Sequence, residues 1–135
     1  MFFSTKKKLS ERQIKRAGLD YWDKLDIEEH MNLENFLEKY KPEENNMYFV
    51  TTKGKHIYSD PTYEDMDEVF LLFGKETKGL PEDLLQKYIE NTIRIPMRNT
   101  LRSLNLSNSV AIITYEILRQ IEFDGLKEKR DYFWE

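Results

Sequence analysis

The hydrophobic pattern of the chain is strongest at Val69–Phe73, where five apolar residues follow one another without polar alternation. Such a run predicts a strand that is buried on both faces, as in a parallel sheet covered by helices. Gly74 follows this strand, Gly79 comes five residues later, and Pro81 is placed to open a helix that extends to about Glu90. A strand, a glycine-bearing loop and a helix often form a ligand crevice in α/β sheets, although most such joints are simple turns.

Other segments show the same alternation of strand and helix. Short apolar strands are predicted at Met47–Thr52 and Thr92–Met97, with a weaker one at Leu25–His30. Between the two stronger strands, Lys53–Lys55 is expected to form a turn around its glycine. A polar loop, Arg98–Ser109, separates the last strand from a periodic helix. Strands that alternate with helices predict a three-layer α/β domain with a mostly parallel sheet flanked by helices.

Three helices are predicted from capping residues and from apolar residues at helical spacing. Ser10, with Gln13 three positions on, has a capping-box pattern for a helix that ends at Gly18. Asn32 is the expected N-cap of a helix over Leu33–Tyr40.

The last helix is expected to begin after Ser107 as N-cap and to extend to about Ile121. Its apolar stripe consists of Val110, Ile113, Ile117 and Ile121.

The composition indicates a globular protein. The chain has 135 residues, of which 39% are hydrophobic and 13% aromatic, so we expect residues 1–135 to form a single domain with a real core. There are no cysteines, which excludes disulfides and thiolate chemistry and favours a reducing, cytoplasmic location. Only His30 and His56 are present, without the spacing of metal ligands, so a zinc enzyme is not expected.

The charge is unevenly distributed. The net charge is −4, which disfavours nonspecific nucleic-acid binding over the whole surface. Residues 1–16 nevertheless contain six basic groups against the single acid Glu11, whereas residues 17–46 contain nine acidic groups against three basic ones. The basic segment is either a solvated helix face or a local contact for RNA phosphates, and its sequence favours neither.

Two motifs resemble a known family. Residues 74–81 read G-x-E-x-x-G-L-P, and residues 95–110 read I-P-M followed by R-S-L-N-L-S-N-S-V. These stretches are similar to motifs two and three of the SPOUT (α/β-knot) RNA methyltransferases. Within that superfamily the match is closest to the TrmL group, transfer RNA 2′-O-methyltransferases that act on the wobble nucleotide. Lys15–Tyr21 and Phe49–Gly54 resemble the same group, so the likeness runs from about Phe3 to Gln120.

The resemblance implies a fold, a cofactor and partners. It implies an α/β knot, in which the loops after Phe73 and Met97 thread into a C-terminal trefoil knot around S-adenosylmethionine. It also implies transfer RNA, through its anticodon loop, as substrate, a homodimer as the working assembly, and no metal or membrane. The first motif of the family, N-x-G-N-x-x-R, has no counterpart here. We therefore expect an N-terminally truncated domain that lacks the first strand and helix, whether by a truncated reading frame, a misassigned start or a genuinely shorter protein.

The resemblance also assigns site residues, one position at a time. The implied cofactor-binding residues are Val50, Gly74, Ile95, Ser103 and Leu104. The implied catalytic or site-organising residues are Glu76, Arg102, Asn105, Ser107 and Tyr115. Six of the ten have a simpler structural alternative: Val50 and Ile95 as core, Ser107 as a helix cap, Arg102 and Glu76 as solvated charges, and Tyr115 as a packing residue. The arginine that activates the 2′-hydroxyl in the family belongs to the missing motif, so no residue takes that role here.

Three functional hypotheses follow. The first is a transfer RNA 2′-O-methyltransferase that uses S-adenosylmethionine. The second is a non-catalytic truncated knot that binds cofactor or RNA without turnover. The third is an unrelated small α/β protein that binds a nucleotide.

Overall fold

The computed structural model describes residues 2–4, 27–75, 78–98, 105–124 and 126. Its strands are β1 (Phe2–Ser4), β2 (Met47–Val50), β3 (His56–Ile57), β4 (Phe70–Phe73) and β5 (Thr92–Arg94). Its helices are α2 (Leu33–Lys39), α3 (Glu82–Lys87), the 3-10 turn η2 (Ile89–Asn91) and α4 (Leu106–Gln120). The predicted helix after Ser10 lies outside the described residues.

The strands form one sheet in the order β1-β4-β2-β5-β3, and every neighbouring pair is parallel. In the register of this sheet, Val50 lies opposite both Phe73 of β4 and Ile93 of β5. The carboxyl ends of the three central strands therefore reach the same edge of the sheet. The predicted mostly parallel sheet flanked by helices is confirmed.

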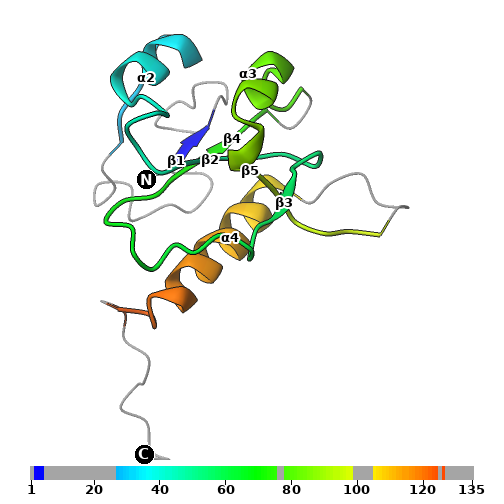
Figure 1. Ribbon diagram of the computed structural model, residues 1–135. Coiled ribbons are helices and arrows are strands. Elements are labelled where there is room, and N and C mark those ends of the chain that lie inside the picture. The colour runs from blue at the N-terminus through cyan, green and yellow to red at the C-terminus, as the bar shows by residue number, and fades with distance from the viewer. Residues whose placement is uncertain (1, 5–26, 76–77, 99–104, 125, 127–135) are drawn as a thin grey trace, which may run out of the picture.

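The sheet is covered on both faces (Figure 1). On one face, Met47, Phe49, Phe70 and Leu72 pack with Phe36 of α2 and with apolar residues of α3. On the other face, Tyr48, Leu71, Phe73 and Ile93 pack with Ile113 of α4. Because successive side chains of a strand point to opposite faces, β2 and β4 each contribute to both clusters. This double burial explains the unbroken apolar run of β4, whose four residues are all buried.

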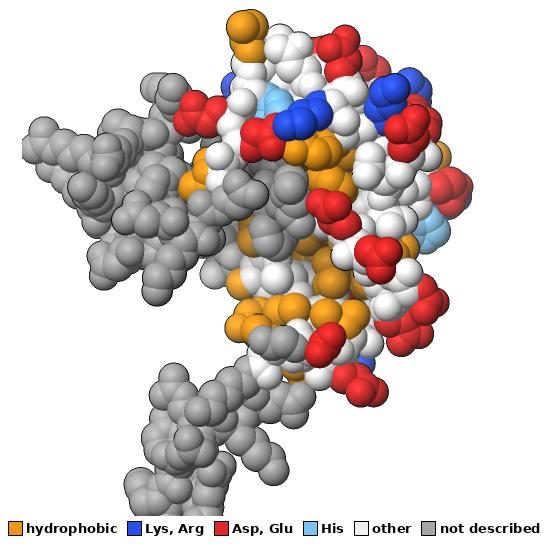
Figure 2. Space-filling model, turned by 90° about the vertical axis from the view of Figure 1, so that its left-hand side faces the viewer, with side chains coloured by type: hydrophobic (Ala, Val, Ile, Leu, Met, Phe, Trp, Pro, Cys, Tyr) orange, Lys and Arg blue, Asp and Glu red, His pale blue; other side chains and the backbone are white. Residues whose placement is uncertain are grey.

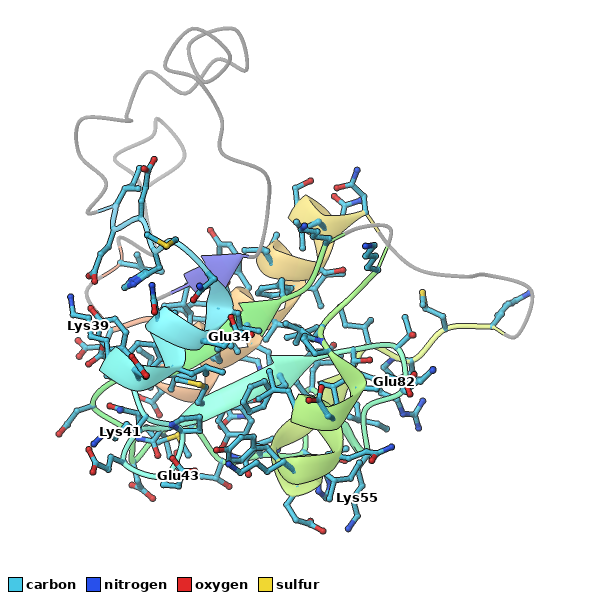
Figure 3. The ribbon with its side chains drawn as sticks, turned by 90° about the horizontal axis from the view of Figure 1, so that it is seen from above. Glu34, Lys39, Lys41, Glu43, Lys55 and Glu82 are labelled. Carbon is cyan, nitrogen blue, oxygen red and sulfur yellow. The ribbon has the colours of Figure 1, made fainter. Side chains whose placement is uncertain are left out.

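Helix α2 forms as its sequence predicts. The side chain of Asn32 accepts a hydrogen bond from the backbone N–H of Asn35 at 2.8 Å, so Asn32 is the N-cap. Phe36 is buried, and the remaining predicted face, Leu33, Leu37 and Tyr40, packs against the same cluster. Seen from above, charged side chains such as Lys39, Lys41 and Glu43 project from the rim of this layer (Figure 3).

Several predicted boundaries are wrong by one to three residues. Strand β2 ends at Val50 and β5 at Arg94, earlier than predicted, because the chain then turns into loops at the edge of the sheet. Pro81 is the N-cap of α3 and not its first helical residue, since its ψ of 135° is extended. The backbone leaves α-helical geometry at Tyr88, whose ring stacks on Phe49 with centroids 5.4 Å apart, and η2 follows.

Two further predictions fail. Within the weakly predicted strand, the described residues 27–30 have no regular structure. Helix α4 is capped by Asn105 and not by Ser107. The Asn105 side chain accepts from the backbone N–H of Ser107 at 2.9 Å, so the short polar side chain two residues earlier provides the cap. Within the predicted stripe of α4, Ile113 is buried, and Val110 and Ile117 pack against it.

The loop that precedes β4 contains a core residue that the sequence pattern did not reveal. Tyr63 is completely buried, and its hydroxyl donates a hydrogen bond to the carbonyl of Tyr58 at 2.7 Å. Its backbone N–H donates to the side chain of Gln120 on α4 at 2.8 Å. Burial strongly raises the pKa of Tyr63, so the phenol stays protonated and remains a donor. Tyr63 thereby fastens the loop to α4.

None of the described helices is long and apolar enough to cross a membrane. Among the described residues, no three His, Cys, Asp or Glu side chains are grouped so that they could hold a metal ion. The loop after Met97 includes residues 99–104, which lie outside the described part, so the knot stays a prediction.

Tyr63→Phe should lower the free energy of unfolding by about 1–2 kcal/mol, because the part-buried carbonyl of Tyr58 loses its donor. Urea denaturation followed by circular dichroism measures this loss. Tyr115→Phe is the matched control, since Tyr115 is 60% exposed and its hydroxyl can remain in water. Equal stability of the two variants would contradict the assigned role of Tyr63.

Candidate functional site

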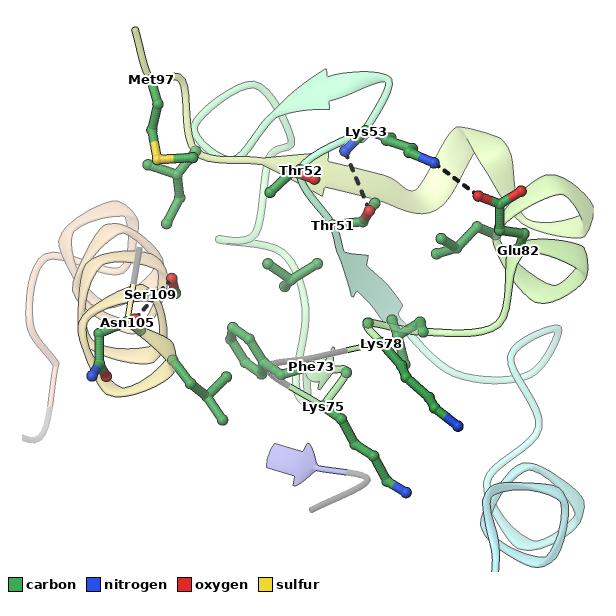
Figure 4. A pocket seen from close by; sticks show the side chains of 17 residues that line it. Thr51, Thr52, Lys53, Phe73, Lys75, Lys78, Glu82, Met97, Asn105 and Ser109 are labelled. Carbon is green, nitrogen blue, oxygen red and sulfur yellow. Dashed lines mark hydrogen bonds and ion pairs between the residues drawn. The ribbon is translucent and has the colours of Figure 1, made fainter. Parts of the chain in front are cut away.

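A cavity of about 740 Å³ opens at the carboxyl edge of the sheet. Its size is within the range of about 300–1,000 Å³ typical of small-molecule sites. The walls come from the loops after β2, β4 and β5 and from the first turns of α3 and α4 (Figure 4). The described lining residues are Val50, Thr51, Thr52, Lys53, Phe73, Gly74, Lys75, Lys78, Gly79, Leu80, Glu82, Leu85, Ile95, Met97, Asn105, Leu106 and Ser109.

The inner wall of the cavity is formed by the ends of the three central strands. Val50, Phe73 and Ile95 supply apolar surface, and all three belong to or pack against the cluster beneath α4. The backbone N–H of Thr51 donates to the carbonyl of Ile93 at 3.0 Å and ties the first residue after β2 to β5. This wall offers apolar surface and main-chain groups, which suits a flat heterocyclic ring.

Gly74 allows the loop after β4 to fold back on itself. A Cβ atom added to Gly74 would lie 2.1 Å from the carbonyl carbon of Gly79 and 2.3 Å from the backbone nitrogen of Leu80. The loop closes through a hydrogen bond from the N–H of Gly79 to the carbonyl of Lys75, 2.8 Å long. Main-chain packing within the loop therefore requires a glycine at this position, whereas the close approach of a ligand to Gly74 stays a prediction.

Gly54 has a similar role in the loop after β2. A Cβ atom there would lie 2.4–2.8 Å from the backbone of Ile93 and Arg94. The N–H of Gly54 donates to the carbonyl of Thr51 at 3.1 Å, which closes the predicted turn. The turn therefore packs directly on β5, and residues 51–53 are held against the cavity.

The start of α4 forms another wall. Asn105 and Ser109 line the cavity, and the Ser109 hydroxyl donates to the carbonyl of Asn105 at 3.2 Å. The side-chain oxygen of Asn105 also accepts a bond from the Ser107 hydroxyl at 2.7 Å. The side-chain oxygen of Asn105 is thus engaged in capping α4, and this cap fixes where the wall begins.

Charged side chains lie across the cavity from α4. Lys53 Nζ lies 2.8 Å from Glu82 Oε1, whereas Lys75 and Lys78 both extend outward from the loop after β4 (Figure 4). The ion pair raises the pKa of Lys53 and lowers the pKa of Glu82, so both groups are charged at neutral pH. The cavity therefore has an apolar inner wall and a charged rim.

The structure brings together four of the residues that the sequence assigned to the site: Val50, Gly74, Ile95 and Asn105 line the cavity. Ser107 does not line it and instead supports the cap of α4. Tyr115 is 60% exposed, two residues from the buried Ile113 and so on the opposite side of α4, and does not line the cavity. The other four, Glu76, Arg102, Ser103 and Leu104, lie outside the described residues.

Sequence reasoning did not assign several lining residues, among them Thr51, Lys53, Lys78, Glu82 and Met97. The signal was available in part, because each of them lies at a predicted strand end, in the loop that follows one, or at the start of the next predicted helix. What could not be read from the sequence is which side chains of these loops face the cavity.

Comparisons with known proteins agree with this fold. An RNA methyltransferase from Bacillus anthracis, provisionally named, superposes with a TM-score of 0.82 at 32% identity, covering 96% of this chain and 82% of that one. A structure described as giving insight into 2-OH methylation of C/U34 on tRNA superposes with a TM-score of 0.77 at 33% identity, over 90% and 78% of the two chains. Fold and cavity thus define an α/β domain of the SPOUT methyltransferase type.

The chain belongs to the SpoU rRNA methylase family, whose sequence model matches residues 1–115. A Listeria monocytogenes protein, provisionally named tRNA (cytidine(34)-2′-O)-methyltransferase, is 48% identical over 123 residues, which cover 90% of this chain and 72% of the relative. The resemblance found in the sequence is confirmed, and the hypothesis of an unrelated nucleotide-binding protein is wrong.

Gly74→Ala should destabilise the protein by about 2–3 kcal/mol, since the new methyl group overlaps backbone that has no room to move. Gly79→Ala should cost only about 1 kcal/mol, the cost of a side chain at positive φ. Gly79 has a φ of 67°, but a Cβ there meets no atom within 4 Å. Urea denaturation of both variants distinguishes the two costs. A larger loss for Gly79→Ala would contradict the packing described for Gly74.

Proposed function

We propose that the protein transfers a methyl group from S-adenosylmethionine to the ribose 2′-hydroxyl of the wobble nucleotide of transfer RNA. The observation that carries this proposal is the cavity at the carboxyl edge of the sheet, where Val50, Gly74 and Ile95 meet. The names of the similar proteins support the same reaction and the same nucleotide. The family match supports methyl transfer as the chemistry.

The described residues fit the proposed cofactor. The inner wall offers the adenine an apolar surface at Val50 and Ile95, together with main-chain groups of the loop at Gly74. When bound, S-adenosylmethionine supplies a methyl group that its sulfonium already activates. The protein therefore mainly has to align the ribose hydroxyl with that methyl group and assist the loss of the proton. Ser103 and Leu104 complete the proposed set of cofactor contacts.

The proposed site-organising residues act around this cavity. Asn105 and Ser107 fix the start of α4 through their shared hydrogen bonds, and so fix one wall. Glu76 organises the loop after β4, and Arg102 binds a phosphate or orients the nucleophile. Tyr115 does not line the cavity of its own chain, so it can act at a reaction centre only if a second subunit places its cavity against the exposed face of α4.

The proposed assembly follows from this last point. We infer a homodimer in which the exposed face of α4, including Tyr115, lies near the partner's site. The proposed RNA contacts include the basic residues of segment 1–16. Among the charged side chains visible in Figure 2, acidic ones predominate over basic ones, so a polyanionic substrate needs such local basic groups. A cytoplasmic location, where transfer RNA is modified, belongs to the same proposal.

Isothermal titration calorimetry with S-adenosylmethionine, together with transfer of a tritiated methyl group to transfer RNA, tests the proposal. We expect saturable binding and incorporation at the wobble ribose, mapped by resistance of that position to alkaline cleavage. Binding without incorporation would instead support the non-catalytic module. The absence of both would contradict the assignment of the cavity.

A further inference from the structure

At the rim of the cavity, Lys53 and Glu82 form an ion pair that connects two different walls. Lys53 extends from the turn after β2, and Glu82 belongs to the first turn of α3, so their contact of 2.8 Å joins two walls. Among the described residues that line the cavity, Glu82 is the only one with a carboxylate. The other charged lining residues in this part of the chain are Lys75 and Lys78.

The backbone of each partner is held in place. The N–H of Lys53 donates to the side-chain oxygen of Thr51 at 3.2 Å, and the adjacent Gly54 packs on the backbone of β5. Glu82 follows Leu80, which is 5% exposed, and the N-cap Pro81. The pair therefore stands at a fixed place on the rim.

The charged ends of the pair are, in contrast, free to change partners. The side chains of Lys53 and Glu82 are 76% and 68% exposed. A pair so open to water contributes little to stability, so its two charges can accept new partners at small cost. An arrangement with fixed stems and exchangeable charges suits ligand binding better than structural support.

The cavity is also polarised from one side to the other. Met97 and the start of α4 lie on one side, and Lys53 and Glu82 lie on the opposite side (Figure 4). A ligand that fits this distribution has an apolar ring at one end and both a negative and a positive group at the other. An amino acid joined to a nucleoside has this form.

We propose that Lys53 and Glu82 bind the amino-acid end of the cofactor. Lys53 donates to the α-carboxylate, and Glu82 accepts from the α-ammonium group, so that one exposed ion pair is exchanged for two. Lys75 and Lys78 could serve only the carboxylate, because the ammonium group requires an anion. This assignment rests on the proposed function and adds two residues that recognise the charged groups of the ligand.

The test compares two nucleosides by calorimetry. S-adenosylhomocysteine has the charged amino-acid end, and 5′-methylthioadenosine lacks it. In Lys53→Met and in Glu82→Gln, the affinity for S-adenosylhomocysteine should fall about tenfold, as expected for loss of a charge-assisted hydrogen bond. The affinity for 5′-methylthioadenosine should change by less than about twofold, which is within the usual effect of a lost surface charge.

Two controls separate a ligand role from a structural one. Lys55 and Glu90 form a comparable exposed ion pair that does not line the cavity, so Lys55→Met should leave both affinities unchanged. The double exchange Lys53→Glu with Glu82→Lys keeps an ion pair but interchanges its charges. It should not restore the affinity for S-adenosylhomocysteine, whereas restoration would mean that the pair only joins the walls and would overturn the inference.

The outcomes also separate this inference from the proposed function. If the parent protein binds neither nucleoside, the proposed cofactor is wrong and the inference falls with it. If the parent binds both, and the variants lose neither affinity or lose both equally, the cofactor assignment stands and the role of Lys53 and Glu82 is refuted.

Discussion

The parallel register of three strands is the constraint on which the site depends. Val50 lies opposite Phe73 and Ile93, so β2, β4 and β5 end at nearly the same level. Parallel strands bring like ends together, and the loops that follow them meet at one edge. Burial on both faces holds this register, because a shift by one residue would exchange the side chains of the two clusters.

The loops build the cavity with backbone as much as with side chains. Gly74 and Gly54 each lie against the main chain of a neighbouring segment, where even a methyl group has no room. These close contacts fix the loops after β4 and β2, and the cap at Asn105 fixes the start of α4. The result is a preformed apolar wall with charged residues at its rim, which is the distribution that a charged nucleoside requires.

Much of the fold could be predicted from the sequence, because periodicity and capping residues are local signals. The run at Val69–Phe73 indicated a strand buried on both faces, and Asn32 indicated the start of α2. The structure ends β2 and β5 earlier than the sequence predicts, because residues 51–52 and 95–97 continue the strand pattern but belong to loops at the cavity. The burial of Tyr63 could not be predicted from the sequence, because it arises from contacts with residues distant in sequence, such as Gln120.

The site was predicted through resemblance more than through physics. Gly74 and Asn105, which motif spacing assigned to the site, both line the cavity, but the sequence pattern alone could not tell that Lys53 and Glu82 would meet across 29 residues. Ion pairs between loops depend on the tertiary fold, and no local rule predicts them. The sequence predicts Ser107 as the cap, and not Asn105, because serine and asparagine are nearly equivalent at N-caps and only the backbone path decides between them.

A crystal structure of the complex with S-adenosylhomocysteine tests the central claim most directly. We predict that the nucleoside lies against Val50, Gly74 and Ile95, at the carboxyl edge of the sheet. A nucleoside bound elsewhere, for example in the polar depression between Ser59–Thr62 and the end of α4, would contradict the claim that the ends of β2, β4 and β5 form the cofactor site.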